Sequence, residues 1–189
     1  MNPIASLLSA FGLSTAAGLN AYIPLLVIGL LDRYTDLVRL SAPYDVLSNP
    51  WVLLAIGVLA LVDFVGDKVP AVDHAFHAVG VIIHPVAGAV LFMAANGQAG
   101  AVNPVLAAIC GVILAGLTHG ARAAARPVAT ATTAGVANPV VSFLEDLGSL
   151  TLSVLAVLVP LLAFILALLG FLALLLLLRR VWPRRSGAR

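Results

Sequence analysis

Residues 51–70 read WVLLAIGVLALVDFVGDKVP, and this stretch decides the fold class. Residues 51–62 carry no charge, but they are too few to cross a bilayer, which takes about 20 residues of helix. The helix is therefore predicted to continue through Asp63 toward Lys68, which places Asp63 inside the membrane. A carboxylate at the centre of a bilayer costs roughly 3 kcal/mol to insert, so such residues usually face a bundle interior or a polar path.

Composition indicates the same class for the whole chain. Of its 189 residues, 62% are hydrophobic and 10% are charged, whereas a soluble domain is about 25% charged. The N-terminal segment lacks a basic region followed by a cleavage site, so no removed signal peptide is predicted. The single cysteine, Cys110, lies in an apolar run and forms no internal disulfide. Residues 179–189 form a basic tail, typical of an orientation signal that contacts lipid headgroups rather than nucleic acid.

Apolar stretches divide the chain into about six predicted transmembrane helices. The first covers residues 4–31 and is broken in composition by Gly18, Asn20 and Pro24, where we expect a kink or an unwound point. Later spans are expected at residues 51–68, 74–95, 104–120 and 138–178. The last stretch would be about 60 Å long as one helix, enough for two spans with a turn at Pro160, and one long tilted helix remains the alternative.

The positive charges favour six spans. With both termini in the cytoplasm, eight Lys and Arg residues lie inside and only Arg33 and Arg39 lie outside, as the positive-inside rule requires. A five-span model would place the C-terminal arginines opposite Arg122 and Arg126. We therefore predict an all-α polytopic membrane protein with a single transmembrane domain, residues 1–178, and a basic cytoplasmic tail.

Six spans divide into two sets of three, residues 1–98 and 99–178, which would face opposite ways across the membrane as an inverted repeat. Asn-Pro pairs open a helix in both sets, at residues 49–50 and 138–139, and an acidic-then-glycine motif follows, DFVGD in one and EDLGS in the other. The spacing between pair and motif differs, so the halves align only with gaps. Coincidence remains the alternative.

Intramembrane carboxylates are the first candidate site residues, and they come as two pairs. Asp63 and Asp67 lie one turn apart on one helix face, where two carboxylates can share a proton or supply oxygen ligands to a cation. An interfacial ion pair with Lys68 is the alternative for Asp67. Glu145 and Asp146 point about 100° apart on a helix, so at most one faces the same cavity as Asp63. We expect Glu145 to be that partner, against the alternative of acids that complement a helix N-terminus.

Arg122 and Arg126 lie four residues apart on one helix face. They are expected to bind a phosphate or carboxylate, or to neutralise buried acids, and orientation signals at a cytoplasmic helix end are the alternative. Asn20 is predicted to offer polar ligands at the broken first helix. His84, the deepest histidine of the third span, is a candidate proton relay. The His and Asp residues at 73–84 are too loosely spaced to predict a metal site, and no motif indicates a cofactor.

Four segments carry a resemblance to a known family: GLSTAAGLNAYIPLL (12–26), DFVGDKVPAVD (63–73), HPVAGAVLF (84–92) and NPVVSFLEDLGS (138–149). Over most of its length the chain resembles a family of small bacterial membrane proteins, defined as domain of unknown function 4126. The resemblance implies a bacterial inner-membrane protein of several helices. It implies no activity, substrate or catalytic residue.

The sequence is compatible with three functions. The first is a small transporter or channel-like protein for a small polar solute or ion, proton-coupled through Asp63 and Glu145, with Asn20 completing the site. The second is a lipid or polyprenyl-phosphate binding protein in which Arg122 and Arg126 hold the phosphate. The third is a non-transporting assembly partner. No nucleotide loop or nucleophile motif is present, so an enzyme is not predicted, and the small size favours a homodimer.

Overall fold

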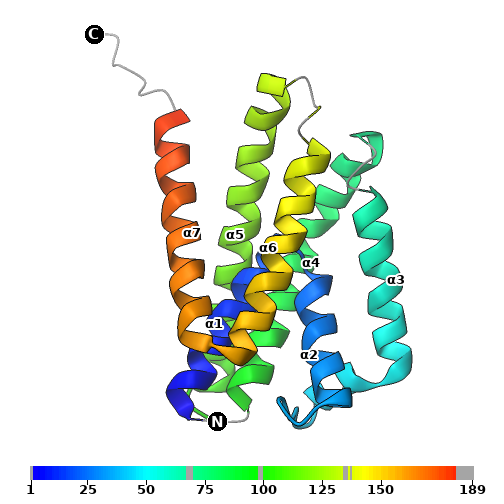
Figure 1. The fold of residues 1–189 in the computed structure, drawn as a ribbon, viewed down its shortest axis with the longest axis vertical. Helices are drawn as coiled ribbons and strands as arrows, with labels where there is room; N and C mark the ends of the chain where they lie inside the picture. Colours follow the sequence, from blue (N-terminus) through cyan, green and yellow to red (C-terminus); the bar gives the residue numbers. More distant parts are fainter. Residues whose placement is uncertain (1, 67–69, 98–99, 134–135, 137, 182–189) are drawn as a thin grey trace.

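The computed structural model describes residues 2–66, 70–97, 100–133, 136 and 138–181 of the chain. This part folds into seven α-helices and one short 3-10 helix, η1, and contains no strand (Figure 1). In chain order the elements are α1 (Pro3–Leu19), α2 (Tyr22–Tyr34), η1 (Tyr44–Ser48), α3 (Pro50–Gly66), α4 (Pro70–Gly97), α5 (Pro104–Thr133), α6 (Asn138–Leu158) and α7 (Pro160–Val181). The all-α prediction is confirmed.

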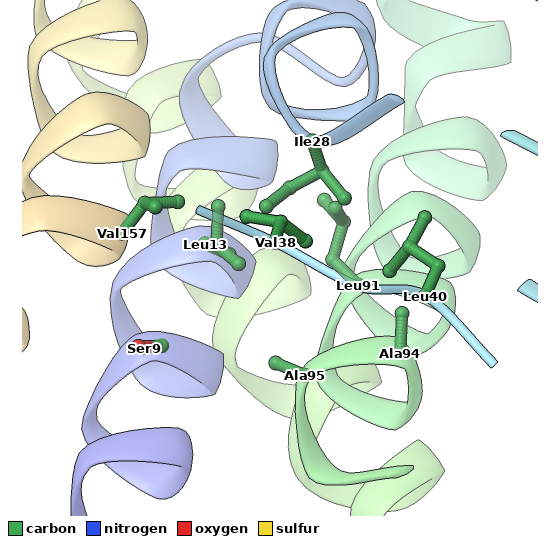
Figure 2. Close-up of a pocket in the computed structure, with 9 residues that line it drawn as sticks. All are labelled: Ser9, Leu13, Ile28, Val38, Leu40, Leu91, Ala94, Ala95 and Val157. Atoms are coloured by element: carbon green, nitrogen blue, oxygen red, sulfur yellow. The ribbon is translucent and has the colours of Figure 1, made fainter. Parts of the chain in front are cut away.

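The first two helices form a hairpin that enters the bundle and turns back at Asn20. In Figure 1, α2 runs from the middle of the bundle toward the end at which α1 begins. The two helices therefore lie beside each other. Figure 2 shows that Leu13 of α1 and Ile28 of α2 line one small cavity together with Val38, which follows α2. The helix is broken at Asn20, within the stretch where a kink or an unwound point was expected, but its two parts form a hairpin instead of the single span expected over residues 4–31.

Asn20 makes the turn between these helices. Its backbone is extended, with φ −145° and ψ 123°, and its N–H still bonds the carbonyl of Ala16 at 3.0 Å. Its side-chain Oδ1 accepts the N–H groups of Tyr22 at 2.9 Å and Ile23 at 3.1 Å. These are N–H groups that the start of a helix leaves without partners, and Pro24 has no N–H to satisfy. Asn20 therefore ends α1 and caps α2.

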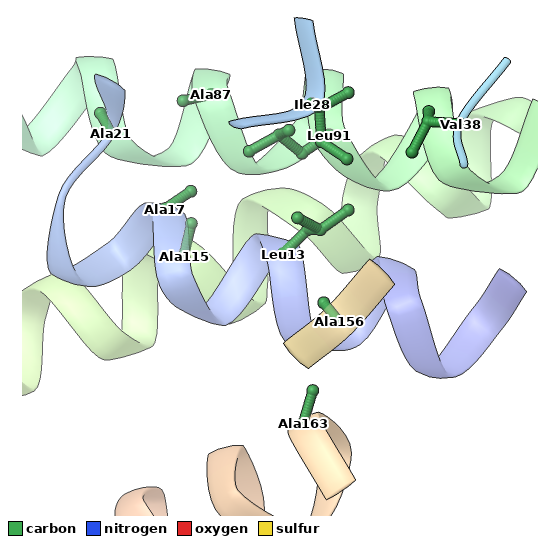
Figure 3. Close-up of a cluster of buried hydrophobic side chains, with 10 residues drawn as sticks. All are labelled: Leu13, Ala17, Ala21, Ile28, Val38, Ala87, Leu91, Ala115, Ala156 and Ala163. Carbon is green, nitrogen blue, oxygen red and sulfur yellow. The ribbon is translucent and has the colours of Figure 1, made fainter. Parts of the chain in front are cut away.

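Helix α1 is the centre of the bundle and is buried along most of its length. The helices α4, α5, α6 and α7 all pack against it. Its buried residues are mainly alanine, glycine, serine and threonine, so neighbouring backbones approach closely. Buried hydroxyls donate to backbone carbonyls, from Ser9 to Ala156 at 2.7 Å and from Ser14 to Gly88 at 2.9 Å. Figure 3 shows the apolar cluster around α1, to which α2, α4, α5, α6 and α7 contribute.

Several helices have the length and composition of membrane spans. Within the described residues, three qualify fully: Val79–Gly97 in α4, Pro104–Arg126 in α5, and Asn138–Leu158, which is α6. Shorter apolar helices are Pro3–Leu19, Pro50–Gly66 and Pro160–Ala173. These findings indicate a multi-pass membrane protein. The break between α6 and α7 falls at Pro160, so residues 138–178 form two helices as expected, and α3 continues beyond Asp63 as expected.

The two ends of the chain lie differently from the six-span expectation. Helices α3 to α7 run alternately up and down the bundle, so α1 begins at one end and α7 finishes at the other (Figure 1). The termini were expected on one side, and the difference arises because the α1–α2 hairpin returns to its own side. The expected inverted repeat is not shown, because the first half opens with this hairpin, whereas α5 of the second half is one uninterrupted helix of 30 residues.

Candidate functional site

The C-terminal end of α1 lies inside the bundle, where its last carbonyls have no further helical turn to bond. Side chains from other helices bond them instead. Nδ1 of His84, on α4, lies 2.6 Å from the carbonyl oxygen of Ala17. Nη1 of Arg122, on α5, donates to the carbonyl of Leu19 at 2.6 Å. The positive charge of Arg122 also complements the negative end of the α1 dipole, so these two side chains stabilise the broken helix.

Ser149 of α6 completes this set of contacts. Its hydroxyl lies 3.0 Å from the carbonyl oxygen of Ala16 and 3.3 Å from that of Asn20. Ser149 was not among the predicted site residues. The signal that marks it is the serine stripe of α6, in which Ser142, Ser149 and Ser153 recur at helical spacing and are all buried.

Glu145 of α6 joins the two arginines of α5. Its Oε2 lies 2.6 Å from Nε of Arg122 and 2.7 Å from Nη2 of Arg126. The side chains of Glu145, Arg122 and Arg126 are 13%, 5% and 9% exposed, respectively. Charges enclosed to this degree depend on one another, because removing one partner leaves the others uncompensated. The arginines were expected to bind a phosphate or carboxylate, or to neutralise buried acids. In the structure, both lie against the carboxylate of Glu145.

Two further carboxylates meet at the tip of the hairpin. Nδ2 of Asn20 lies 2.9 Å from Oδ1 of Asp146, on α6, and 3.3 Å from Oδ2 of Asp63, on α3. Asn20 is only 3% exposed. Its amide nitrogen therefore bridges two acids while its oxygen caps α2. Both carboxylates lie at the N-terminal end of α2, where the helix dipole favours negative charge.

Two cavities flank this Asn20 bridge. One, of about 260 Å³, lies between α2, α3 and α4 and is lined in part by Tyr22, Asp63 and His84. The other, of about 550 Å³, lies between α2, α3 and α6 and has Asn20 and Asp146 among apolar lining residues. Asp63 therefore borders one cavity and Asp146 borders the other, and the Asn20 amide connects them.

His84 forms a stacked pair with His119 of α5, with ring centroids 4.1 Å apart and planes at 26°. Because a carbonyl oxygen only accepts hydrogen bonds, the contact with Ala17 places a proton on Nδ1 of His84. Both rings are buried. Among the side chains that the structure describes, no three His, Cys, Asp or Glu residues lie close enough to hold a metal ion.

A family model matches residues 7–180, and its description is Domain of unknown function (DUF4126). The chain belongs to the DUF4126 family. The matched range contains the hairpin, the Asn20 bridge and the Glu145 ion pairs. The comparisons with curated proteins and with solved structures found no match.

In this DUF4126 chain, the predicted site residues fall into two groups. Asn20, Asp63 and Asp146 meet at the hairpin tip, and the ion pairs of Glu145 lie beside it, since Arg122 contacts both Glu145 and the end of α1. His84 borders the smaller cavity. Asp67 lies outside the described residues. The carboxylate joined to Asp63 is Asp146 rather than the expected Glu145, because the rotation of α6 directs Glu145 toward the arginines of α5.

Proposed function

We propose that this protein is a small membrane transporter for a cationic solute or ion, coupled to protons, with Asp63 and Asp146 as its binding carboxylates. The Asn20 bridge is the observation that carries the proposal, because two carboxylates from different helices converge on one amide nitrogen inside an apolar bundle. Carboxylates in largely apolar surroundings are costly unless they bind hydrogen-bond donors, protons or cations. A break in a helix within the bundle is also where many transporters form their ion sites.

The charges around the hairpin tip favour a cation over an anion. When ionised, Asp63, Asp146 and Glu145 contribute three negative charges, and Arg122 and Arg126 contribute two positive charges. One bound proton or monovalent cation makes this cluster neutral, which lowers the free energy of burying it. A proton or cation held between two neighbouring carboxylates is attracted by both, which stabilises the pair.

The cavities give this cation a route through the site. A cation leaving Asp63 in the smaller cavity reaches Asp146 and the larger cavity by passing the Asn20 side chain. Tyr22 and His84 are the other polar residues among the described lining of the smaller cavity, and we propose that they exchange protons with Asp63. The proposal needs no catalytic chemistry and no cofactor.

We further propose that the protein lies in the bacterial cytoplasmic membrane with the end at which α5 and α7 finish toward the cytoplasm. Arg122 and Arg126 lie in the second half of α5, and Arg179 and Arg180 lie near the end of α7. Among the described residues, only Arg33 and Arg39 are basic at the opposite end. This distribution follows the positive-inside rule, and the hairpin then enters from the outer side.

Lipid-phosphate binding has less support. The two guanidinium groups that would hold the phosphate are both in ion pairs with Glu145. A phosphate would have to displace Glu145 and leave this carboxylate buried without its partners, which is strongly unfavourable.

The transport proposal is tested with protein reconstituted into liposomes that contain a pH-sensitive dye, under an imposed gradient of an alkali-metal chloride and, in a parallel series, of an organic-cation chloride. Asp63→Asn and Asp146→Asn keep the size of each side chain but remove its charge. Each is expected to lower cation-dependent proton flux about tenfold to a hundredfold, because a lost hydrogen bond to a charged group costs about 1.5–3 kcal/mol. Asn20→Ala, which removes the bridge, is expected to act in the same direction.

Asp36→Asn is the matched control for these variants. Asp36 pairs with Arg39 on the exposed segment after α2 and lies in neither cavity. The proton flux of the Asp36→Asn variant is expected to equal that of the wild type. Unchanged flux and pH dependence in both Asp63→Asn and Asp146→Asn would show the proposal to be wrong, as would wild-type liposomes no more permeable than empty ones.

A further inference from the structure

The larger cavity is built from one face of each of three helices. On α2 this face is Ile23, Leu26, Val27 and Leu30, spaced as successive turns of a helix. α3 and α6 contribute the same spacing, beginning at Gly57 and Phe143, respectively. The volume of about 550 Å³ lies within the range of pockets that bind small organic molecules, about 300–1,000 Å³.

The rim of this cavity faces the surroundings of the bundle. Leu61 of α3 is 62% exposed and Phe143 of α6 is 53% exposed, and both line the cavity. In a membrane protein, exposed apolar side chains on helices of this kind contact lipid chains. A ligand with an apolar body can therefore enter from the side, between α3 and α6, without leaving the hydrocarbon layer.

The inner end of the cavity selects for charge. Asn20 and Asp146 are its only polar lining residues, and every other described lining residue is apolar or glycine. Glu145 and the arginines that it binds are not part of the lining. A phosphate or carboxylate would therefore meet the Asp146 carboxylate, whereas a cationic group would complement it.

From these three observations we infer that the cavity binds an amphipathic organic cation, with its apolar body between α2, α3 and α6 and its charged group at Asp146. The inference rests on the proposed transport function and names the class of its solute. Entry from the bilayer places the charged group one amide away from Asp63, since Nδ2 of Asn20 contacts both carboxylates.

The test is direct binding of tetraphenylphosphonium to the purified full-length protein in nanodiscs, measured by equilibrium dialysis. A large side chain at Gly57 would fill the cavity without a clash, because Gly57 lines it and a Cβ added there meets no atom within 4 Å. Gly57→Phe is expected to weaken binding at least about tenfold by occupying the apolar part, and Asp146→Asn by a similar factor through loss of the charge. Tetraphenylborate, an anion of the same shape, is expected to bind at least about tenfold more weakly than the cation.

Gly170→Phe is the matched control, because Gly170 also has open space around it and lies on α7, away from the cavity. It is expected to bind the cation like the wild type. Wild-type affinity in both Gly57→Phe and Asp146→Asn, or equal affinity for the two ions, would overturn the inference. Flux that depends on Asp63 with cation binding indifferent to Gly57 would overturn this inference alone, whereas binding that follows Gly57 without carboxylate-dependent flux would overturn only the transport proposal.

Discussion

Replacing Glu145 with glutamine is expected to destabilise the protein by about 3–5 kcal/mol, the usual effect of removing one member of a buried ion pair. Glutamine keeps the shape of the side chain but leaves Arg122 and Arg126 without the carboxylate that contacts both guanidinium groups. Thermal unfolding in detergent, followed by circular dichroism, is expected to show a Tm lowered on the order of 10 °C.

Two further variants separate charge from packing. Asp36→Asn removes an acid from an exposed ion pair with Arg39, and such pairs contribute little, so its Tm is expected to stay at the wild-type value. Combining Glu145→Gln with Arg126→Gln removes one of the two positive charges that lose their contact with Glu145 and is expected to recover part of the lost stability. A wild-type Tm in Glu145→Gln would contradict the role assigned to this ion pair.

The helical class and the continuation of α3 past Asp63 followed from simple counting of residues. The uncharged run before Asp63 is too short to span a bilayer, and α3 indeed continues past this residue to Gly66. Pro160 was likewise the only residue that could divide the long C-terminal stretch, and the division falls there. Such predictions succeed because they depend on length and on local backbone chemistry alone.

The hairpin could not be predicted in this way. Residues 4–31 are uncharged and long enough to span, so hydropathy alone favours a single crossing. What permits a helix end inside the bundle is the bonding of its carbonyls by His84, Arg122 and Ser149. These residues lie far from the hairpin along the chain, on three different helices, so their role appears only when the helices are packed.

Glu145 was expected as the partner of Asp63, whereas Asp146 shares the Asn20 amide with Asp63, and the reason is a related one. Because a helix has about 3.6 residues per turn, the two acids fall on opposite flanks of the buried stripe formed by Ser142, Ser149 and Ser153. One flank faces α5 and its arginines, and the other faces the hairpin tip. The sequence of α6 is symmetric in this respect, and only the positions of the neighbouring helices distinguish the flanks.

Arg122 links the architecture of the bundle to the candidate site. It bonds the last carbonyl of α1 through Leu19 and also the carboxylate of Glu145. The residue that follows Leu19 is Asn20, whose amide bridges Asp63 and Asp146. A displacement of α5 would therefore move the end of α1 and the bridge together, so the position of α5 is expected to affect both stability and the proposed transport.

Replacing Gly111 with valine is expected to produce such a displacement. α4 and α5 form the most extensive helix pair among the described residues, and a Cβ added at Gly111 would lie 2.3 Å from the carbonyl oxygen of Gly88 and 2.7 Å from Cα of Ala89. Both are backbone atoms that cannot turn aside, so the helices must separate. We expect a loss of about 3 kcal/mol, at the upper end for overpacking, visible as a lowered Tm and as reduced flux in liposomes.

Gly120→Val is the matched control, since it makes the same change on the same helix at a position where an added Cβ meets no atom within 4 Å. Valine is at least as good a helix former as glycine, so this variant is expected to keep the wild-type Tm. If both variants unfold at the same temperature, the close contact between α4 and α5 does not limit stability. If Gly111→Val loses stability while Gly120→Val does not, the close backbone contact at Gly88 stabilises the packing of α5 against α4, and α5 carries Arg122.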